Sequence, residues 1–474
     1  MIKGMAFAPF IDSNISSMEN IKSLIDVQRV FFNSGRTKDL DFRIEQLRLL
    51  KKVILENEDN LHRAIFADFK KSAFDNYSSE LALLYIEIDD AVRSIKRWAG
   101  YKRVGTNLLN FPAKSYIIPE PLGVSLIIGA WNYPYQLSIG PAIAAIAAGN
   151  TIILKPSELP MHSSRVMADI INNNFDPAFF KVVEGGVPET EELLRQRFDK
   201  IFFTGSAPVG RIVYRAAAQF LTPVTLELGG KSPAFILDDL NMEIYVKRLV
   251  WAKFFNAGQT CIAPDYVLIP ESIKDKFIKL AVSEIKKEEF SVENSNYVQI
   301  INERNILRLS KLLDPSKIVY GGGYNLETRI FEPTILDNVS FDDAVMKEEI
   351  FGPILPVLTF NSLDEVICKI KEGEKPLSCY IFTGNKSLKN KILTEVSFGG
   401  GCVNESIMHV SNSKLPFGGV GESGIGSYHG EYGFKTFSHF KSILEKPTWF
   451  ESKLKYSPHT ELKFKFLKKM LRLL

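Results

Sequence analysis

One cysteine of this chain stands in a segment that could present a reactive thiol. Cys261 occurs in the run Asn256-Ala-Gly-Gln-Thr-Cys-Ile-Ala, directly after a helix-like segment over residues 246–255, and Gly258 allows a sharp turn there. A thiol on such a polar turn can act as a nucleophile when a base and an oxyanion donor lie nearby. The alternative is an inert core residue, because cysteine is among the most buried residue types. We adopt that alternative for Cys368, Cys379 and Cys402.

Two residues elsewhere in the chain could provide the base and the donor. Glu227 follows the apolar, strand-like segment 224–226, where a buried carboxylate is costly unless it has a task or a partner. An ion pair with Lys231 is the alternative interpretation. Asn132 lies at the end of another predicted strand, and its neutral amide suits an oxyanion hole, although the same amide could simply fix the loop in place.

Two further strand ends carry residues suited to a nucleotide. In Phe202-Phe-Thr-Gly-Ser-Ala-Pro-Val-Gly a predicted strand leads into a helix, so Gly205 and Ser206 lie where a helix N-terminus binds phosphate. The glycine spacing there matches neither a Walker loop nor the usual dinucleotide fingerprint. Lys155 and Glu158 follow another strand and suit a cationic and an acidic contact to a ribose, although a surface pair could arise by chance.

Two other segments carry weaker signals. The run Gly419-Val-Gly-Glu-Ser-Gly is a literal G-x-G-x-x-G, but no clear strand precedes it and no helix follows it, so we interpret the match as a loop. Glu349 and Phe351, in Lys347-Glu-Glu-Ile-Phe-Gly-Pro, precede a turn and a strand. Alone, this acidic cluster does not indicate a function.

The elements that must position these residues form an alternating pattern. Residues 20–98 are charged and have apolar positions at helical spacing, which indicates several amphipathic helices. Residues 122–228 alternate strands with helices and residues 229–415 repeat that style, so we predict an α/β fold with doubly wound parallel sheets. Ligands are expected beyond the carboxyl ends of such strands. Residues 99–121 lose the helical period and contain three prolines, which predicts a hairpin leaving the main domain.

Composition excludes several classes of protein. The chain has 474 residues, 45% of them hydrophobic, so it can bury at least one sizeable core and is not mainly disordered. With 58 Lys plus Arg against 55 Asp plus Glu, its charge of +3 is too balanced for a protein whose main surface follows a nucleic-acid backbone. The cysteines include no C-x-x-C pair, which argues against a disulfide framework or a thiolate zinc site and favours a reducing compartment. Residues 1–12 make a poor secretory signal, so we predict a cytoplasmic protein.

An uncharged stretch over residues 121–154 is long enough to cross a membrane. Glycine, asparagine and proline residues divide it into apolar pieces shorter than the roughly 20 residues that a spanning helix needs. We therefore predict a strand, a loop, a buried helix and a second strand.

Taken together, these segments resemble the aldehyde dehydrogenase superfamily from about residue 20 to about residue 446. The runs Leu226-Glu-Leu-Gly-Gly-Lys-Ser and Gly258-Gln-Thr-Cys match the family's glutamate and cysteine signatures, with Glu227 and Cys261 34 residues apart. Within the superfamily, the chain is similar to the class 3 group, which includes the fatty aldehyde dehydrogenases. The runs that carry this similarity are Gly185-Gly-Val-Pro-Glu-Thr, Leu221-Thr-Pro-Val-Thr, Ala263-Pro-Asp-Tyr and Phe417-Gly-Gly-Val-Gly-Glu-Ser-Gly-Ile-Gly-Ser-Tyr-His-Gly.

The resemblance implies oxidation of a medium- or long-chain aliphatic or aromatic aldehyde to a carboxylic acid. Cys261 would carry a thiohemiacetal and then a thioester, while Asn132 and the Cys261 backbone N–H hold the oxyanion. Glu227 would activate the hydrolytic water. The implied cofactor is NAD, with NADP also used, in a Rossmann-variant domain. The residues assigned by similarity to the adenine ribose, the pyrophosphate and the nicotinamide ribose are, in that order, Lys155 and Glu158, Gly205 and Ser206, and Glu349 with Phe351 packing nearby.

The resemblance also implies a domain organisation and a partner. Residues 1–98 and 122–226 would form the NAD(P)-binding domain and residues 227–430 the catalytic domain. Residues 99–121 and 431–447 would form an oligomerisation element, which makes the expected state a homodimer. No metal ion is expected.

Two alternative functions remain open at this stage. A CoA-acylating aldehyde dehydrogenase would release the acyl group to CoA rather than to water, and Glu227 argues against it because such enzymes usually lack that base. A catalytically silent binding protein on the same fold is the second alternative. The joint presence of Asn132, Glu227, Cys261 and Glu349 argues against that one.

The tail over residues 448–474 departs from the class 3 pattern. It has a net charge of +5, against −2 for the rest of the chain. On a helical wheel from Leu462 to Leu474, the apolar residues lie within an arc of about 200° and the cations lie on the opposite arc, with Lys463 the exception. This pattern predicts a basic amphipathic helix that either lies on the inner face of a membrane or packs on the dimer beside a substrate entrance.

Overall fold

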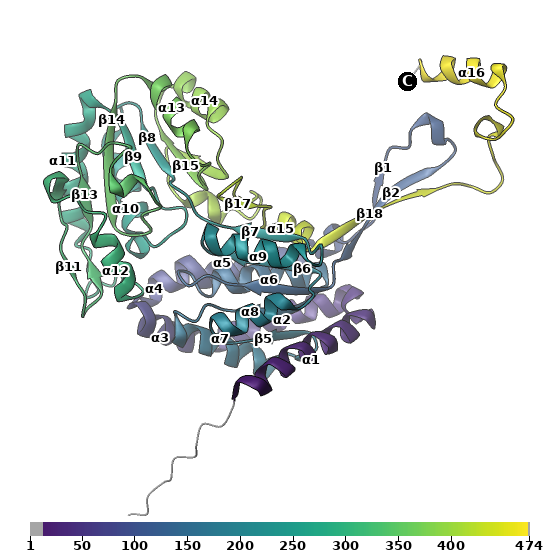
Figure 1. Cartoon of the computed structure of the whole chain (residues 1–474), viewed down its shortest axis with the longest axis horizontal. Helices are drawn as coiled ribbons and strands as arrows, with labels where there is room; N and C mark the ends of the chain where they lie inside the picture. The colour runs from purple at the N-terminus through teal and green to yellow at the C-terminus, as the bar shows by residue number, and fades with distance from the viewer. Residues whose placement is uncertain (1–12, 473–474) are drawn as a thin grey trace, which may run out of the picture.

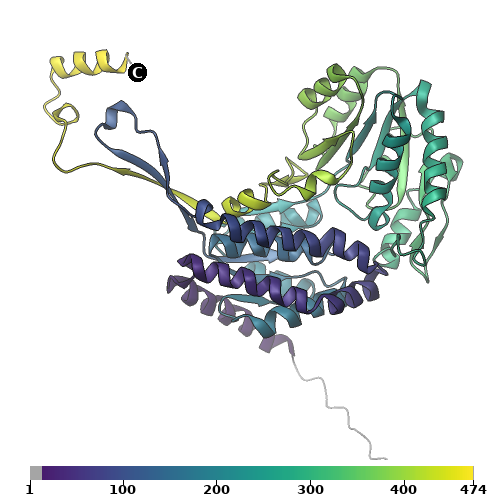
Figure 2. The same cartoon turned by 180° about the vertical axis from the view of Figure 1, so that it is seen from behind.

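The computed structural model describes residues 13–472, with side-chain environments from residue 21 onward. It contains a six-stranded sheet, a seven-stranded sheet and a three-stranded arm (Figures 1 and 2). The segment read as a poor secretory signal, residues 1–12, and the last two leucines of the predicted tail helix lie outside the described residues.

The N-terminal quarter of the chain is helical, as its charged and periodic sequence predicts. The four apolar positions at helical spacing, Ile44, Leu47, Leu50 and Ile54, are all buried. The Asp39 side chain accepts a hydrogen bond from the backbone N–H of Asp41 at the start of the second helix. The helices are α1 (Ser13–Asn33), α2 (Leu40–Glu56), α3 (Glu58–Phe69), α4 (Ala73–Asn76) and α5 (Ala82–Trp98).

The six-stranded sheet confirms the predicted α/β architecture. Its strand order is β17-β7-β6-β3-β4-β5, and all pairs are parallel except β17 with β7. The strands are β3 (Val124–Ile128), β4 (Thr151–Lys155), β5 (Phe180–Val182), β6 (Lys200–Thr204), β7 (Val224–Glu227) and β17 (Gly424–Ile425). The connecting helices are α6 (Gln136–Ala148), α7 (Met161–Asn174), α8 (Val187–Arg195) and α9 (Ala207–Ala218).

Alternate side chains of the central strands enter two separate cores, one on each face of this sheet. In β3, Leu126 and Ile128 pack in a core with residues of α1, α8 and α9, whereas Ile127 packs in a core with residues of α2, α5 and α6. Burial on both faces explains why these strands are uninterrupted apolar runs. The uncharged stretch therefore forms a strand, a buried helix and a strand, and no helix within residues 13–472 is long and apolar enough to cross a membrane.

The second sheet has seven strands in the order β10-β13-β14-β9-β8-β15-β16, all parallel except β10 with β13. The strands are β8 (Pro233–Ile236), β9 (Tyr266–Pro270), β10 (Ile318–Tyr320), β13 (Thr334–Leu336), β14 (Ile354–Phe360), β15 (Ser378–Phe382) and β16 (Gly400–Val403). The helices are α10 (Met242–Phe254), α11 (Glu271–Glu288), α12 (Glu303–Ser310), α13 (Leu363–Glu372) and α14 (Lys386–Glu395). The short helix α15 (Gly430–Thr436) packs instead on α5 and α6, beside the six-stranded sheet. A short hairpin, β11 (Tyr324–Asn325) with β12 (Ile330–Phe331), lies outside this sheet.

The hairpin predicted over residues 99–121 is present as part of the arm. Strand β1 (Lys102–Val104) pairs antiparallel with β2 (Lys114–Pro121), and β18 (Ser438–Glu445) pairs antiparallel with the other side of β2. The arm extends away from the two large sheets, and α16 (Glu461–Leu471) lies at the same end of the molecule (Figures 1 and 2).

A buried ion pair fixes the segment that follows β3. Glu80 and Lys71 are fully buried, with Glu80 Oε1 3.0 Å from Lys71 Nζ. The other carboxylate oxygen of Glu80 accepts hydrogen bonds from the backbone N–H groups of Tyr135 and Gln136, at 2.8 and 3.2 Å. The Lys71 ammonium also lies 4.3 Å from the ring centroid of Tyr133. Glu80 thus anchors the start of α6 and the loop before it.

Replacing Glu80 with alanine should lower the free energy of unfolding by about 3–5 kcal/mol, because the change leaves a buried lysine and two backbone donors without their acceptor. The midpoint of urea unfolding measures this effect. Glu56→Ala is the matched control, since Glu56 is exposed and forms only a 3.8 Å pair with Lys52. Equal midpoints for the two variants would show that the buried pair does not stabilise this loop.

Candidate functional site

Cys261 lies directly after a strained turn. Helix α10 ends at Phe254, and a 3-10 turn over Phe255–Gly258 follows. Asn256, Ala257 and Gly258 all have positive φ, at 53°, 52° and 71°. A Cβ at Gly258 would lie 2.3 Å from the carbonyl oxygen of Gly352, so no larger residue fits there. The glycine was predicted to allow this turn, whereas the left-handed Asn256 and Ala257 were not foreseen.

Amide hydrogen bonds hold this turn against the loop after β3. Asn132 Nδ2 donates to the carbonyl oxygen of Gln259 at 3.0 Å, and Asn256 Nδ2 donates to the carbonyl oxygens of Asn132 and Gln259 at 3.2 and 3.1 Å. The Tyr133 hydroxyl lies 2.6 Å from Thr260 Oγ1. The structure therefore brings Asn132 and the cysteine segment together, and Asn132 does fix the loops, as the alternative interpretation held.

The environment of the Cys261 thiol favours its neutral form. Burial, together with the carboxylates of Glu349 and Glu227, raises the pKa of Cys261 to about 12. The backbone N–H groups of Cys261 and Ile262 act in the opposite direction. At neutral pH the thiol needs a base, or a further positive charge, before it can attack as a thiolate.

Glu227 is the last residue of β7 and is only 2% exposed. Neither of its carboxyl oxygens has a hydrogen-bond partner in the structure, and burial raises its pKa well above the usual range. The ion pair with Lys231 considered above is wrong, because Lys231 Nζ lies 2.5 Å from Asp265 Oδ2 and also donates to two backbone carbonyls. A buried carboxyl group without a partner is costly, which points to a task other than structural stabilisation.

Glu349 and Phe351 reach the same region from the loop before β14. The Glu349 carboxylate lies against the glycine pair after β7, where a Cβ at Gly229 would be 2.1 Å from Glu349 Oε2. Burial and the charge of Asp265 raise the pKa of Glu349 to about 8, although the Gly230 backbone partly offsets that rise. Phe351 has a positive φ of 48° and packs edge-on against Trp131, with ring centroids 5.2 Å apart.

Lys155 lies at the end of β4, the strand next to β3. Its side chain is buried, and Nζ donates to the carbonyl oxygen of Pro156 at 2.7 Å. The carboxylate of Glu158 is half-exposed and lies 3.9 Å from the same nitrogen. Burial lowers the pKa of Lys155, and the charges of Glu158 and Glu189 oppose this change.

Gly205 and Ser206 join β6 to α9 on the same sheet edge. The Gly205 backbone N–H donates to the carbonyl oxygen of Glu227 at 3.0 Å. Ser206 occupies the N-cap of α9, but its side chain accepts no capping hydrogen bond, so the first N–H groups of the helix remain for a ligand. A free helix N-terminus after β6, and a buried cation and an accessible carboxylate after β4, fit the phosphates and ribose of a dinucleotide.

Lys253, on α10 eight residues before Cys261, was not identified from the sequence. It is fully buried, and its ammonium has no hydrogen-bond partner in the structure. Burial lowers its pKa to about 8, while Asp265 and Glu349 raise it and Lys231 lowers it further. The sequence signal for this residue was a lysine between Ala252 and Phe254, in an apolar part of α10 where a buried lysine is rare.

A second buried polar group was also missed. His429 Nε2 lies 3.7 Å from Glu87 Oε1, and the rings of His429 and Tyr428 are 4.4 Å apart. Burial raises the pKa of Glu87 to about 8 and lowers that of His429 to about 4. Burial raises the pKa of Tyr428, and the charges of Glu227 and Glu87 raise it further. Tyr428 and His429 belong to a glycine-rich run of the sequence. Such a run has no periodic pattern from which their burial could be predicted.

Two further sequence interpretations can also be assessed. Cys368 is exposed on α13, so its assignment to the core is wrong, whereas Cys379 is buried as expected. The glycine run from Gly419 ends in the two-residue strand β17, with no helix directly after it, since α15 begins only at Gly430; its interpretation as a loop rather than a dinucleotide fingerprint is confirmed.

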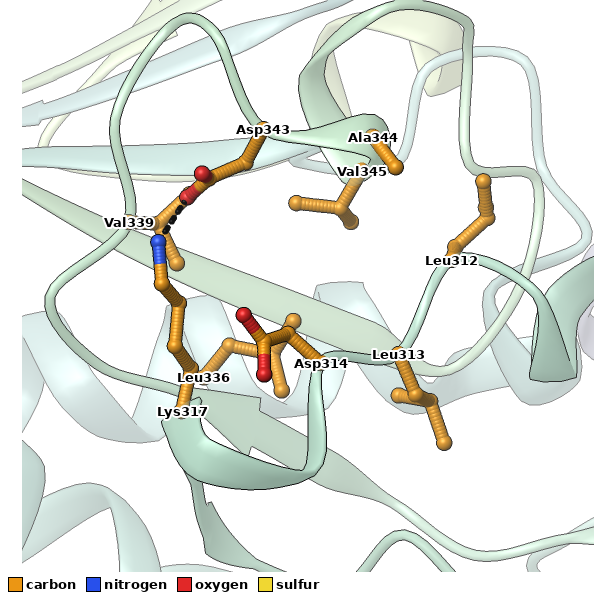
Figure 3. Close-up of a pocket in the computed structure, with 9 residues that line it drawn as sticks. All are labelled: Leu312, Leu313, Asp314, Lys317, Leu336, Val339, Asp343, Ala344 and Val345. Carbon is orange, nitrogen blue, oxygen red and sulfur yellow. Dashed lines mark hydrogen bonds and ion pairs between the residues drawn. The ribbon is translucent and has the colours of Figure 1, made fainter.

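A cavity of about 110 Å³ lies elsewhere, between Leu336, Val345 and the Lys317–Asp343 ion pair (Figure 3). It is smaller than ordinary ligand pockets of roughly 300–1,000 Å³. Because none of the residues discussed above lines it, it is not the candidate site.

Comparisons with known proteins agree with this geometry. The model of the aldehyde dehydrogenase family matches residues 11–443. The 4,4'-diaponeurosporen-aldehyde dehydrogenase of Staphylococcus aureus is 46% identical over 445 residues, which cover 93% of this chain and 96% of that protein. Aldehyde dehydrogenase family 3 member A2 of Mus musculus is 45% identical over 446 residues, covering 93% and 92%.

A solved structure described as the substrate-bound state of Staphylococcus aureus AldH matches with a TM-score of 0.92. Its sequence is 44% identical, and the match covers 95% of this chain and 99% of that one. The family match, the high identity across almost the whole chain and the shared fold lead to one conclusion: this chain belongs to the aldehyde dehydrogenase family.

Proposed function

We propose that this NAD(P)-dependent aldehyde dehydrogenase oxidises medium- or long-chain aliphatic or aromatic aldehydes to carboxylic acids through a thioester on Cys261. The observation that carries the proposal is the buried carboxyl group of Glu227, which has no hydrogen-bond partner in the structure and whose charge adds to the raised pKa of the Cys261 thiol. The relatives support the general activity, since both are aldehyde dehydrogenases by name.

In the first step, the Cys261 thiol gives up its proton to solvent, and the sulfur bonds to the carbonyl carbon of the aldehyde. The carbonyl oxygen becomes an oxyanion, which needs hydrogen-bond donors that are already in position. Asn132 is one donor, because only one of its two amide hydrogens is needed for the bond to Gln259. The backbone N–H of Cys261, which already acts on the sulfur, is the second.

In the second step, the C–H bond of the thiohemiacetal breaks and leaves a thioester on the sulfur. When bound, the nicotinamide supplies the acceptor for the departing hydride. Lys155 and Glu158 would hold the adenine ribose, and the Gly205-Ser206 turn would hold the pyrophosphate. Glu349 would bind the nicotinamide ribose, beside Phe351.

In the third step, Glu227 removes a proton from water while the water oxygen bonds to the acyl carbon. The C–S bond then breaks, the carboxylic acid leaves, and the sulfur of Cys261 is regenerated. A raised pKa makes Glu227 a stronger base than an exposed glutamate, because its conjugate acid holds the proton more tightly. This step also separates the proposal from release of the acyl group to CoA.

The two large sheets and the arm are assigned separate roles. Residues 1–98 and 122–226 would bind NAD(P), and residues 227–430 would supply the catalytic cysteine and Glu349. The arm, over residues 99–121 and 431–447, would form the interface of a homodimer. Large apolar side chains that are exposed on the hairpin support this assignment, namely Tyr101, Leu108, Leu109 and Phe111.

Cys261→Ala should abolish aldehyde oxidation while leaving the fold and NAD binding intact, because sulfur is the covalent carrier. NADH formation measured by absorbance, together with NAD binding measured by calorimetry, checks both parts. The control is Cys368→Ala, which changes an exposed cysteine on α13 and should leave activity unchanged. Activity of Cys261→Ala within about tenfold of the unmodified enzyme would contradict the mechanism, since tenfold is only about 1.4 kcal/mol.

Glu227→Gln should preserve formation of the thioester better than turnover, because water activation belongs to the third step. Stopped-flow absorbance should show a burst of about one NADH per site, followed by a steady rate lowered by about 10²–10⁴. If burst and steady rate fall together, Glu227 acts earlier, on the Cys261 proton.

Glu158→Gln should improve the use of NADP relative to NAD, because the carboxylate repels a 2′-phosphate. We expect NAD to be preferred by the unmodified enzyme and the ratio of kcat/KM values to shift toward NADP by about fivefold, the size of one exposed charge interaction. Glu191→Gln, which changes an exposed glutamate on α8, should leave the ratio unchanged. An unchanged ratio for Glu158→Gln would remove Glu158 from the ribose site.

A further inference from the structure

The C-terminal helix presents an apolar arc to solvent in the structure. Leu462 is 80% exposed, and Phe464 and Phe466 are each 53% exposed. Leu467 and Leu471 are exposed as well. Figures 1 and 2 show α16 clear of both large sheets, at the end of the molecule reached by the arm. A contiguous row of exposed apolar side chains on a folded protein marks a surface that contacts a membrane or another protein.

The opposite arc of α16 is basic. Lys465, Lys468, Lys469 and Arg472 are exposed there, and Glu461 is the only acidic residue of the helix. Lys465 lies 3.8 Å from Glu461, and the ammonium of Lys468 lies 4.3 Å from the ring centroid of Phe464. The remaining cations have no carboxylate within ion-pair distance among the described residues.

The structure also accounts for Lys463, the one cation that the helical wheel places on the apolar arc. Its Nζ turns back and donates to the carbonyl oxygens of Tyr456 and Pro458, at 2.8 and 3.0 Å. The charge is thereby drawn to the N-terminal end of the helix. The apolar arc beyond it is left free of charged groups.

Aromatic side chains precede the helix. Trp449 is 78% exposed, and Phe450 and Tyr456 are also exposed. Aromatic residues with both an apolar ring and a polar group are typical of the boundary between lipid chains and water. The 11 residues of α16 rise only about 16 Å, roughly half the thickness of a hydrocarbon core, so the helix cannot span a bilayer.

We propose that α16 is a membrane-surface anchor, which lies in the plane of an anionic bilayer with its phenylalanines and leucines among the acyl chains and its lysines at the head groups. Packing on a second copy of the chain would cover the apolar arc but would leave the basic arc without a counter-charge, since the rest of the chain is nearly neutral at −2. An anionic membrane offers acyl chains to the apolar arc and negative head groups to the basic arc.

Sedimentation with vesicles of phosphatidylglycerol and phosphatidylcholine tests this inference. The full chain should pellet with these vesicles, more weakly as salt is added, and much less with vesicles of phosphatidylcholine alone. A form that ends at Pro447 should stay in the supernatant. Because neither aldehyde nor cofactor is present, the result is independent of the catalytic proposal.

Charge variants sharpen the test. Lys468→Gln combined with Lys469→Gln should weaken partitioning by about thirtyfold, at about fivefold for each lysine near the surface. The matched control is Lys386→Gln combined with Lys389→Gln, which removes two charges from α14 where neither lysine has an ion pair in the structure. That control should partition like the unmodified chain.

Equal partitioning of the full chain and the truncated form would overturn the proposal. It would also be overturned if truncation abolished vesicle binding only by dissociating the dimer, which size-exclusion chromatography of both forms would reveal, because α16 would then be an interface helix. Loss of binding in a truncated form that keeps the oligomeric state of the full chain supports the anchor.

Discussion

The candidate site depends on one set of hydrogen bonds, between the loop after β3 and the turn before Cys261. The side-chain amide of Asn256 donates to the backbone carbonyl of Asn132, and the backbone carbonyl of Gln259 accepts from the amides of both asparagines. These bonds join a loop of the six-stranded sheet to the turn that follows α10, beside the seven-stranded sheet. They therefore set the position of the Cys261 sulfur relative to the strand ends that suit a dinucleotide. They also help to hold Asn256 in a left-handed conformation that costs energy by itself. The buried Glu80–Lys71 pair also holds the loop after β3, because Glu80 accepts a hydrogen bond from the backbone N–H of Tyr135.

The second constraint is desolvation. Cys261, Glu227 and Glu349 have raised pKa values mainly because burial disfavours their charged forms. Such groups destabilise a fold, and the surrounding cores must compensate for them. The site is also tightly packed, because any side chain at Gly229, after β7, would collide with the Glu349 carboxylate. A dry site also strengthens each electrostatic interaction that the proposed reaction needs.

Much of the architecture followed from local sequence patterns. The continuous apolar runs of β3, β4 and β6 identify strands buried on both faces, and the helical spacing of residues 40–56 identifies α2. Strands as short as β13 and β16 are difficult to predict individually, because three or four residues, two of them glycine in β16, carry too little pattern. Long-range pairing could not be predicted either. Lys231 was considered as the partner of a glutamate four residues away, but it binds Asp265, which the fold brings beside it.

The same limit applies to the site. The types of residues at 132, 227 and 261 indicated an acyl-transfer chemistry, but burial of Lys253 and the Glu87–His429 pair depends on packing from several elements at once. The left-handed backbone of Asn256 and Ala257 likewise has no signature in residue type, since alanine rarely adopts it.

The central claim is that the acyl group of the aldehyde is carried on the sulfur of Cys261. Mass spectrometry of Glu227→Gln, quenched in acid during the burst with NAD and an aliphatic aldehyde, tests it most directly. The account predicts one added acyl group per chain, on the peptide that contains Cys261, in an amount equal to the NADH formed. NADH formation without an adduct, or an adduct on Cys368, Cys379 or Cys402 instead, would contradict it.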